Sequence, residues 1–188
     1  YDGNTNATVL TRTLNGVLPA DTNNVSLTGG TASFANATAS PGKTVTLAGA
    51  TLTGTAAANY NLTAVATTTA AITALGITGS FTTQDKVYDG NTNATVLTRT
   101  LNGVLTADTN NVSLTGGTAS FANATAGPGK TVTLAGASLS GTAAGNYSLT
   151  SVGTITAAIT KAALSVTADA KTKPYGAADP AFTASYAG

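Results

Sequence analysis

The sequence predicts an all-β chain, and three observations lead to that class. Short segments throughout the 188 residues alternate apolar side chains with Thr, the pattern of half-buried strands. Glycines interrupt these segments at short intervals, as turns and strand ends do. The Ala-rich stretch TAAIT (156–160) has some helix propensity, but it is short and lies among Thr, Val and Ile, which favour strands. No segment therefore predicts a helix.

The chain contains a long internal repeat. Residues 1–18 and 88–105 both read YDGNTNATVLTRTLNGVL, and a shift of 87 positions places 1–73 over 88–160 with 64 of 73 residues identical. The register continues more weakly beyond residue 160, where Lys86 meets Lys173 and Tyr88 meets Tyr175. This period exceeds the roughly 20–50 residues of common solenoid repeats and suits a small self-contained domain. We expect three parts: repeat 1 (1–73), which lacks its entering strand, repeat 2 (74–160), and the start of a diverged third repeat (161–188).

The strands expected in repeat 2 follow one another closely. The stretches ATVLTRTL (94–101) and KTVTLAG (130–136) alternate apolar and polar residues. Between them, VSLTGGTASFA (112–122) predicts a hairpin of two strands around a Gly-Gly turn. Further short strands follow around Gly141 and Gly145, and ITAAITKAALSVTA (155–168) continues the alternation across the repeat boundary. We expect six to eight short strands in each repeat.

A tyrosine begins a late strand in each repeat, Tyr60 after Ala-Asn and Tyr147 after Gly-Asn. Immunoglobulin-like sandwiches often place a tyrosine there whose hydroxyl bonds to nearby backbone; an ordinary buried aromatic is the alternative. The pattern predicts tandem small β-sandwich domains of the immunoglobulin-like type. The junction 72–87 has no Pro-, Ser- or charge-rich linker, so we expect the domains to form a stiff rod.

The composition excludes most chemistry. The sequence has no Cys, His, Met, Trp or Glu, so the usual zinc and iron ligands and the Ser–His and Cys–His catalytic pairs are absent. The seven Asp residues lie in turn-like contexts and do not form an acid–base pair. A net charge of +1 provides no basic surface for nucleic acid, and no apolar run reaches the ~18–20 residues of a membrane helix. We expect no enzyme, cofactor, nucleic-acid partner or membrane insertion. Because Tyr1 begins within a motif, we also expect a fragment of a longer protein.

The motif DGNTN is the best candidate for ion binding. Its residues Asp2, Asn4 and Asn6 alternate as at the start of a calcium loop, and Asp89, Asn91 and Asn93 repeat the pattern. An EF-hand loop also needs a bidentate Glu, which this chain lacks. Asx turns that satisfy local backbone groups are the favoured interpretation, and calcium binding is the alternative.

Covalent cross-linking is a second candidate reaction. Lys43, Lys86 or Lys130 could attack an Asn or Asp side chain, with Asp89 or Asp108 moving the protons. A lysine at the start of a strand is usually only a solvated side chain, and the sequence favours that interpretation.

The segments KVYDGNT (86–92) and KPYGAADPAFTASYAG (173–188) resemble the YDG and MBG repeat modules of large bacterial surface adhesins of the filamentous-haemagglutinin type. The motif residues are Tyr1, Asp2, Gly3, Tyr60, Lys86, Tyr88, Asp89, Gly90 and Tyr147 for the YDG pattern, and Lys173, Tyr175, Gly176, Asp179, Pro180 and Phe182 for the MBG pattern. The resemblance implies an extracellular stalk of tandem β domains on a Gram-negative bacterium. It implies no enzymatic activity and supplies no ligand-binding residue.

We therefore expect a stalk or spacer of a cell-surface or secreted adhesin, in contact with neighbouring repeats. It would extend an adhesive region, outside this chain, toward a host or surface glycan or receptor. One alternative is a self-assembling fibre subunit, because the low charge leaves strand edges free and residues 161–175 could complete repeat 1 of another copy. The other alternative is a glycan- or receptor-binding module, since loops carry function without a motif.

Overall fold

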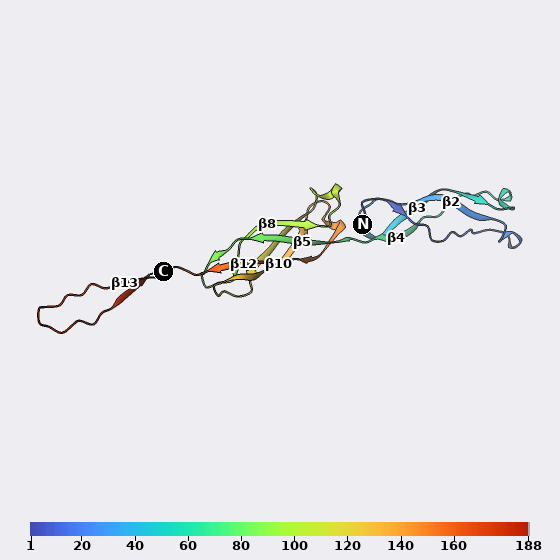
Figure 1. Ribbon diagram of the computed structural model, residues 1–188. Helices are drawn as coiled ribbons and strands as arrows, with labels where there is room; N and C mark the ends of the chain where they lie inside the picture. The colour runs from blue at the N-terminus through green and yellow to red at the C-terminus, as the bar shows by residue number, and fades with distance from the viewer. Residues whose placement is uncertain (188) are drawn as a thin grey trace. The chain divides into compact units, whose positions relative to one another are not determined.

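The computed structural model describes residues 1–187 and confirms the all-β class (Figure 1). The described residues contain strands and short 3-10 helices but no α-helix, and none of their helices is long and apolar enough to cross a membrane. The chain divides into two compact units. Unit 1 comprises residues 1–79, 101–115 and 138–151, and unit 2 comprises 80–100, 116–137 and 152–187.

The strands follow one another along the whole described chain. In repeat 1 they are β1 (Asn6–Ala7), β2 (Ser26–Phe34), β3 (Ser40–Thr53) and β4 (Thr68–Ile72). In repeat 2 they are β5 (Leu75–Thr83), β6 (Lys86–Val87), β7 (Asn93–Ala94), β8 (Val96–Asn102), β9 (Ser113–Phe121), β10 (Gly127–Ser140), β11 (Tyr147–Val152) and β12 (Ile155–Thr160). The tail adds β13 (Ser165–Ala168) and β14 (Ala184–Ala187). The 3-10 helices are η1 (Pro19–Asp21), η2 (Ala57–Asn59), η3 (Thr106–Asp108) and η4 (Ala144–Asn146).

The strand number expected for each repeat holds for repeat 2 and is wrong for repeat 1. Repeat 1 forms one sheet in the order β1-β2-β3-β4. Its segments 9–15 and 60–65, the counterparts of β8 and β11, are not strands although their sequences are nearly the same. In repeat 2, β8 and β11 flank β5 in a sheet of the order β11-β5-β8. Repeat 1 has no counterpart of β5, so both segments lack the strand that would pair with them.

The hairpin expected around Gly116 and Gly117 is also wrong. Strand β9 passes through both glycines without turning. In repeat 1, where the same residues form β2, the pairing with β3 keeps one register on both sides of the glycines, from Ser26↔Thr53 to Phe34↔Val45. At Gly117 φ is +78°, and a Cβ there would lie 2.8 Å from a Leu134 methyl carbon. The glycine pair therefore lets two long strands twist and approach closely in place of a turn.

Repeat 2 contains a second, larger sheet with the order β6-β12-β10-β9-β7. Strand β12 is antiparallel to β10 but parallel to β6, with Ile159 opposite Lys86 and Thr160 opposite Val87. In the tail, β13 and β14 form an antiparallel pair.

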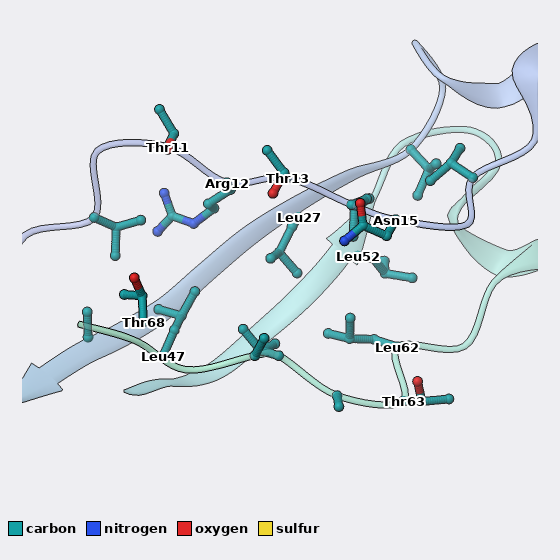
Figure 2. Close-up of a pocket in the computed structure, with 18 of the residues that line it drawn as sticks. Thr11, Arg12, Thr13, Asn15, Leu27, Leu47, Leu52, Leu62, Thr63 and Thr68 are labelled. Atoms are coloured by element: carbon teal, nitrogen blue, oxygen red, sulfur yellow. The ribbon is translucent and has the colours of Figure 1, made fainter. Parts of the chain in front are cut away.

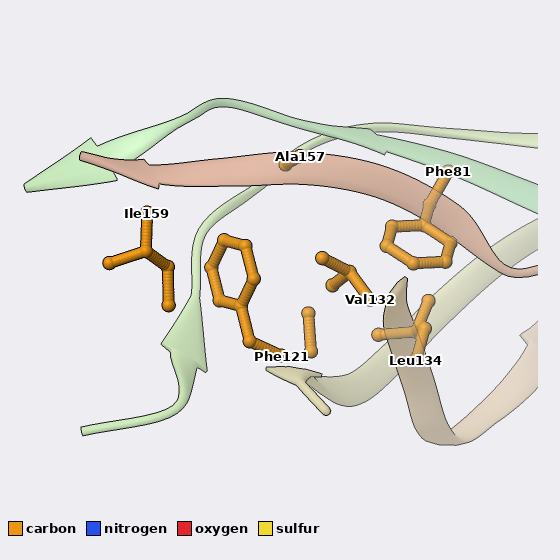
Figure 3. Close-up of a cluster of buried hydrophobic side chains, with 7 residues drawn as sticks. Phe81, Phe121, Val132, Leu134, Ala157 and Ile159 are labelled. Carbon is orange, nitrogen blue, oxygen red and sulfur yellow. The ribbon is translucent and has the colours of Figure 1, made fainter. Parts of the chain in front are cut away.

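Each unit has its own hydrophobic core. In unit 2, the rings of Phe81 and Phe121 lie on either side of Val132 (Figure 3), and Ala119, Leu134, Ala157 and Ile159 complete the cluster. In unit 1, Ile77 packs with Val112, Ala143 and Tyr147. Strand β5 contributes the large residues Ile77 and Phe81 to these cores, and they are only 2% and 3% exposed. Burying two such side chains contributes about 1.5–3 kcal/mol each, so β5 is a principal source of stability in repeat 2.

Candidate functional site

A hydrogen-bonded tyrosine and aspartate join a loop to a late strand in each repeat. The hydroxyl of Tyr147 donates to Asp108 Oδ2 at 2.7 Å and accepts from the amide of Leu105 at 3.2 Å. Tyr60 repeats this with Asp21 at 2.8 Å and the Leu18 amide at 3.1 Å. The hydroxyl therefore bonds to backbone as expected, but the amide lies 42 residues upstream. The contact closes a long loop instead of a local corner.

Tyr1 joins the same carboxylate within unit 1. Its hydroxyl donates to Asp108 Oδ2 at 2.8 Å, and its ring meets that of Tyr147 edge-on, with 5.5 Å between the ring centroids. Burial and the bond to Asp108 raise the pKa of Tyr147 to about 12, and the bond to Asp108 also raises the pKa of Tyr1. Both hydroxyls thus remain protonated donors at neutral pH. Tyr88, the same motif residue in repeat 2, is 45% exposed.

The lysine of the motif K-x-Y-D-G holds the following loop. Lys86 Nζ lies 2.7 Å from Asp89 Oδ1 and 2.9 Å from both the backbone and side-chain oxygens of Asn91. The ammonium also lies 5.8 Å from the centroid of the Phe121 ring. The bond from Lys86 lowers the pKa of Asp89. Lys86 therefore neutralises the loop carboxylate from inside the chain.

The Asx turns expected in DGNTN are confirmed in both copies. The amide of Asn91 donates to Asp89 Oδ1 at 3.1 Å, and that of Asn93 donates to Asn91 Oδ1 at 2.9 Å. In repeat 1 the Asn4 amide donates to Asp2 Oδ1 at 3.1 Å, and the Asn6 amide to Asn4 Oδ1 at 2.8 Å. The oxygens considered for calcium are thus used by backbone amides and, in repeat 2, by Lys86.

Repeat 1 carries an apolar groove that sequence reasoning did not locate. It has a volume of about 810 Å³ and lies within unit 1. Figure 2 shows Leu27, Leu47 and Leu52 between a segment that carries Thr11 and Thr13 and another that carries Leu62 and Thr63. These two segments are the ones that fail to form strands. The signal in the sequence was the missing entering strand of repeat 1, which implied an uncovered core.

The YDG domain model matches residues 1–70 and 74–157. This chain belongs to the YDG domain family. No curated protein and no solved structure matches it. In both YDG repeats the motif Asp starts an Asx turn, and the motif Tyr differs in exposure between the copies.

The lysines considered for cross-linking lie beside asparagines in both YDG repeats. Lys43 Nζ bonds to Asn36 Oδ1 and, at 2.8 Å, to Thr38 Oγ1. Lys130 does the same with Asn123 and Thr125, the latter at 2.9 Å. The acids considered as proton carriers are engaged elsewhere, since Asp89 bonds to Lys86 and Asp108 to the tyrosines. The structure brings Lys and Asn together but does not place either acid beside them.

The residues of the MBG-like motif lie in the tail that follows the second YDG repeat. Lys173 Nζ contacts Asp179 Oδ1 at 2.5 Å, and both side chains are exposed. Tyr175 and Phe182 are also exposed, and Gly176 has a φ of +81°. None of the described residues after 160 is buried, and the last residue of the motif, Gly188, lies outside the described residues.

Proposed function

We propose that the chain is a stalk or spacer segment of a bacterial adhesin, on the cell surface or secreted. In this proposal its YDG repeats are small immunoglobulin-like sandwiches that follow one another as a rod outside the cell. They extend an adhesive region without carrying out chemistry. The sequence supports the proposal because it lacks the side chains that most enzymes and metal sites use.

The observation that carries this proposal is the parallel pairing of β6 with β12. These are the strands at which the chain enters the larger sheet of repeat 2 and leaves it. The Tyr88 amide donates to the Thr160 carbonyl at 2.8 Å, and the Ala158 amide donates to Asp85 Oδ1 at 2.6 Å. The Thr160 hydroxyl also bonds to the Lys86 carbonyl at 3.2 Å. Side-chain bonds thus reinforce a short ladder.

This pairing resists tension along the chain. Two parallel neighbours point the same way, so force on the start of β6 and the end of β12 slides one strand along the other. Their hydrogen bonds are then loaded together and must break together. In an antiparallel pair pulled from adjacent ends, by contrast, the bonds open one after another. A spacer that transmits load needs the first arrangement.

Single-molecule pulling of the whole chain tests the proposal. The sequence has no natural cysteine, so attachment points can be chosen freely. The variant Gln84→Cys/Lys161→Cys loads β6 and β12 in shear. The matched control Gly127→Cys/Lys161→Cys pulls β10 and β12 apart from one end, because Gly127 pairs with Ile159. We expect a clearly higher unfolding force for the first variant. Equal forces, or unfolding at negligible force in both, would remove the mechanical role.

A further inference from the structure

We propose that the groove of repeat 1 accepts an extended strand of the β5 type, with apolar residues spaced as in Leu75, Ile77 and Phe81, donated by a second polypeptide. The repeat would then be completed by strand addition, in which backbone bonds give affinity and apolar side chains give specificity. The inference concerns this groove alone and does not depend on the stalk role.

The first argument is the surroundings of Ile77. In repeat 2 this side chain packs with Val112 and Tyr147, and Leu101, Val104 and Leu139 border the same cluster. The corresponding residues of repeat 1, 87 positions earlier, all line the groove: Val25, Tyr60, Leu14, Val17 and Leu52. One end of the groove therefore has the lining that surrounds an isoleucine in repeat 2.

The second argument is the surroundings of Phe81. Its cluster in repeat 2 includes Ala119, Val132 and Leu134, and Val96 and Val152 pack against it. The corresponding residues of repeat 1 again line the groove: Ala32, Val45, Leu47, Val9 and Val65. The remainder of the groove is thus lined as the phenylalanine site is in repeat 2.

The third argument is burial. Phe121, Leu134, Tyr147 and Ile159 are buried in repeat 2, with exposed fractions of 2%, 8%, 5% and 1%. Their counterparts in repeat 1, Phe34, Leu47, Tyr60 and Ile72, are only partly buried. Identical residues thus expose more apolar surface where the β5-type strand is missing, and covering such surface stabilises a complex by about 25 cal/mol per Å².

The fourth argument is the backbone. Strand β5 is the central strand of the sheet β11-β5-β8, so it satisfies amides and carbonyls on both sides. Hydroxyl pairs add to this, since Ser80 bonds to Thr100 and Thr82 to Thr98. In repeat 1 the counterparts of those threonines, Thr13 and Thr11, are exposed. Segments 9–15 and 60–65 therefore offer an incoming strand two edges at once.

The tail of another copy is a poorer occupant than a β5-type strand. Shifted by 87 residues, the tail places Leu164 at the position of Ile77 but Ala168 at the position of Phe81. Alanine would leave the phenylalanine site largely empty, and Phe→Ala changes in cores cost about 3–5 kcal/mol. Leu164 and Val166 of β13 are nevertheless 71% and 57% exposed, so the tail belongs in the test.

Titration of a fluorescently labelled peptide with the full chain tests the inference. The probe is LGITGSFTT, the sequence of residues 75–83. We expect saturable binding of one peptide per chain, and hydrogen-exchange protection at 9–15 and 60–65. The same peptide with Ile77→Asp and Phe81→Asp should bind at least tenfold more weakly. In the chain, Leu47→Asp should weaken binding similarly, whereas Leu97→Asp, on the exposed face of β8, should not change it.

A second variant keeps the test decisive if Leu47→Asp unfolds repeat 1. In it, the sequence of residues 74–87 is placed directly before Tyr1, so that repeat 1 receives its own entering strand. Peptide binding should then be lost. Continued binding by this variant, equal binding of the Asp-substituted peptide, or no saturable binding at all would each overturn the inference. Tighter binding of the tail peptide AALSVTADA than of LGITGSFTT would overturn the choice of occupant.

Discussion

Tyr147 and Asp108, 39 residues apart in the chain, share a hydrogen bond of 2.7 Å between the tyrosine hydroxyl and the carboxylate. Tyr147 begins β11, while Asp108 ends the 3-10 helix η3 in the loop after β8. Because the hydroxyl also accepts from the Leu105 amide, one buried side chain anchors that loop at two points. Its equivalents in repeat 1, Tyr60 and Asp21, form the same bond at 2.8 Å.

Removing the hydroxyl of Tyr147 should lower stability. We expect Tyr147→Phe to reduce the free energy of unfolding by about 1–2 kcal/mol, because two hydrogen-bond partners of a buried group are lost while the ring is kept. Urea denaturation followed by far-UV circular dichroism measures the effect. Tyr175→Phe is the matched control, since Tyr175 is fully exposed. Equal effects of the two changes would contradict the tether.

The same tyrosine should make the fold sensitive to alkali. The pKa of Tyr147 is raised to about 12 in the folded chain, against 10.0 for the unperturbed group. The folded state therefore holds the proton longer than the unfolded state. Its contribution to stability is complete below pH 10 and is lost as the pH rises toward about 12. Denaturation at a series of pH values should show this fall, and it should be smaller in Tyr147→Phe. An unchanged profile in that variant would contradict the assignment.

Lys86 should control the titration of Asp89. The bond from Lys86 lowers the pKa of this carboxyl below 3.8. The stabilisation that accompanies a lowered carboxyl pKa is present above the unfolded value and is lost as the pH falls through the folded one. In Lys86→Met the pKa of Asp89 should return toward its ordinary value, as NMR titration of the side-chain carboxyl can measure. Lys161→Met, a change at another lysine, should leave it unaltered. A pKa of Asp89 that did not move in Lys86→Met would show that the lysine is not its main partner.

The sequence predicted what depends on local chemistry. Asx turns at Asp89 and Asn91 need only residues two positions apart, and both formed as expected. The alternating pattern of KTVTLAG likewise lies inside β10. Such features could be predicted because neighbours along the chain decide them.

Features decided by distant partners could not be predicted in this way. Segment 9–15 has the same sequence as β8, but only β8 has β5 beside it. The glycine pair 116–117 favours a turn locally, but the pairing of β9 with β10 keeps the strand straight through it. The bond from Tyr147 to Asp108 spans 39 residues, and nothing in the sequence indicated that this Asp and not another would accept it.

The unpaired segments of repeat 1 should exchange their amide hydrogens quickly. We expect faster deuterium uptake at 9–15 and 60–65 than at β8 and β11, because the first pair of segments lacks a central strand. Mass spectrometry of peptides from these regions makes the comparison directly. Since residues 9–15 and 96–102 are identical in sequence, their intrinsic rates nearly cancel. Equal uptake would show that repeat 1 completes its sheet by another route.

The glycine pair in β9 should not tolerate a side chain. In Gly117→Ala the new Cβ would lie 2.8 Å from Leu134 Cδ1 and 3.1 Å from the Ala135 carbonyl, at a φ of +78°. We expect a loss of about 2 kcal/mol or more from backbone strain and overpacking together. Gly145→Ala is the control, since nothing lies within 4 Å of its added carbon and its φ is not positive. Thermal unfolding compares the two. A Gly117→Ala chain as stable as the control would refute the close strand approach.

The position of β5 at the start of repeat 2 sets the order in which the protein can mature. Translation delivers the amino-terminal end first, so the segment that fills the core of repeat 2 leaves the ribosome before the sheets that will enclose it. A repeat of this kind can therefore finish folding as soon as its own last residues emerge, without waiting for its successor. During synthesis or export, the open core of such a repeat would never need to search for a strand from elsewhere.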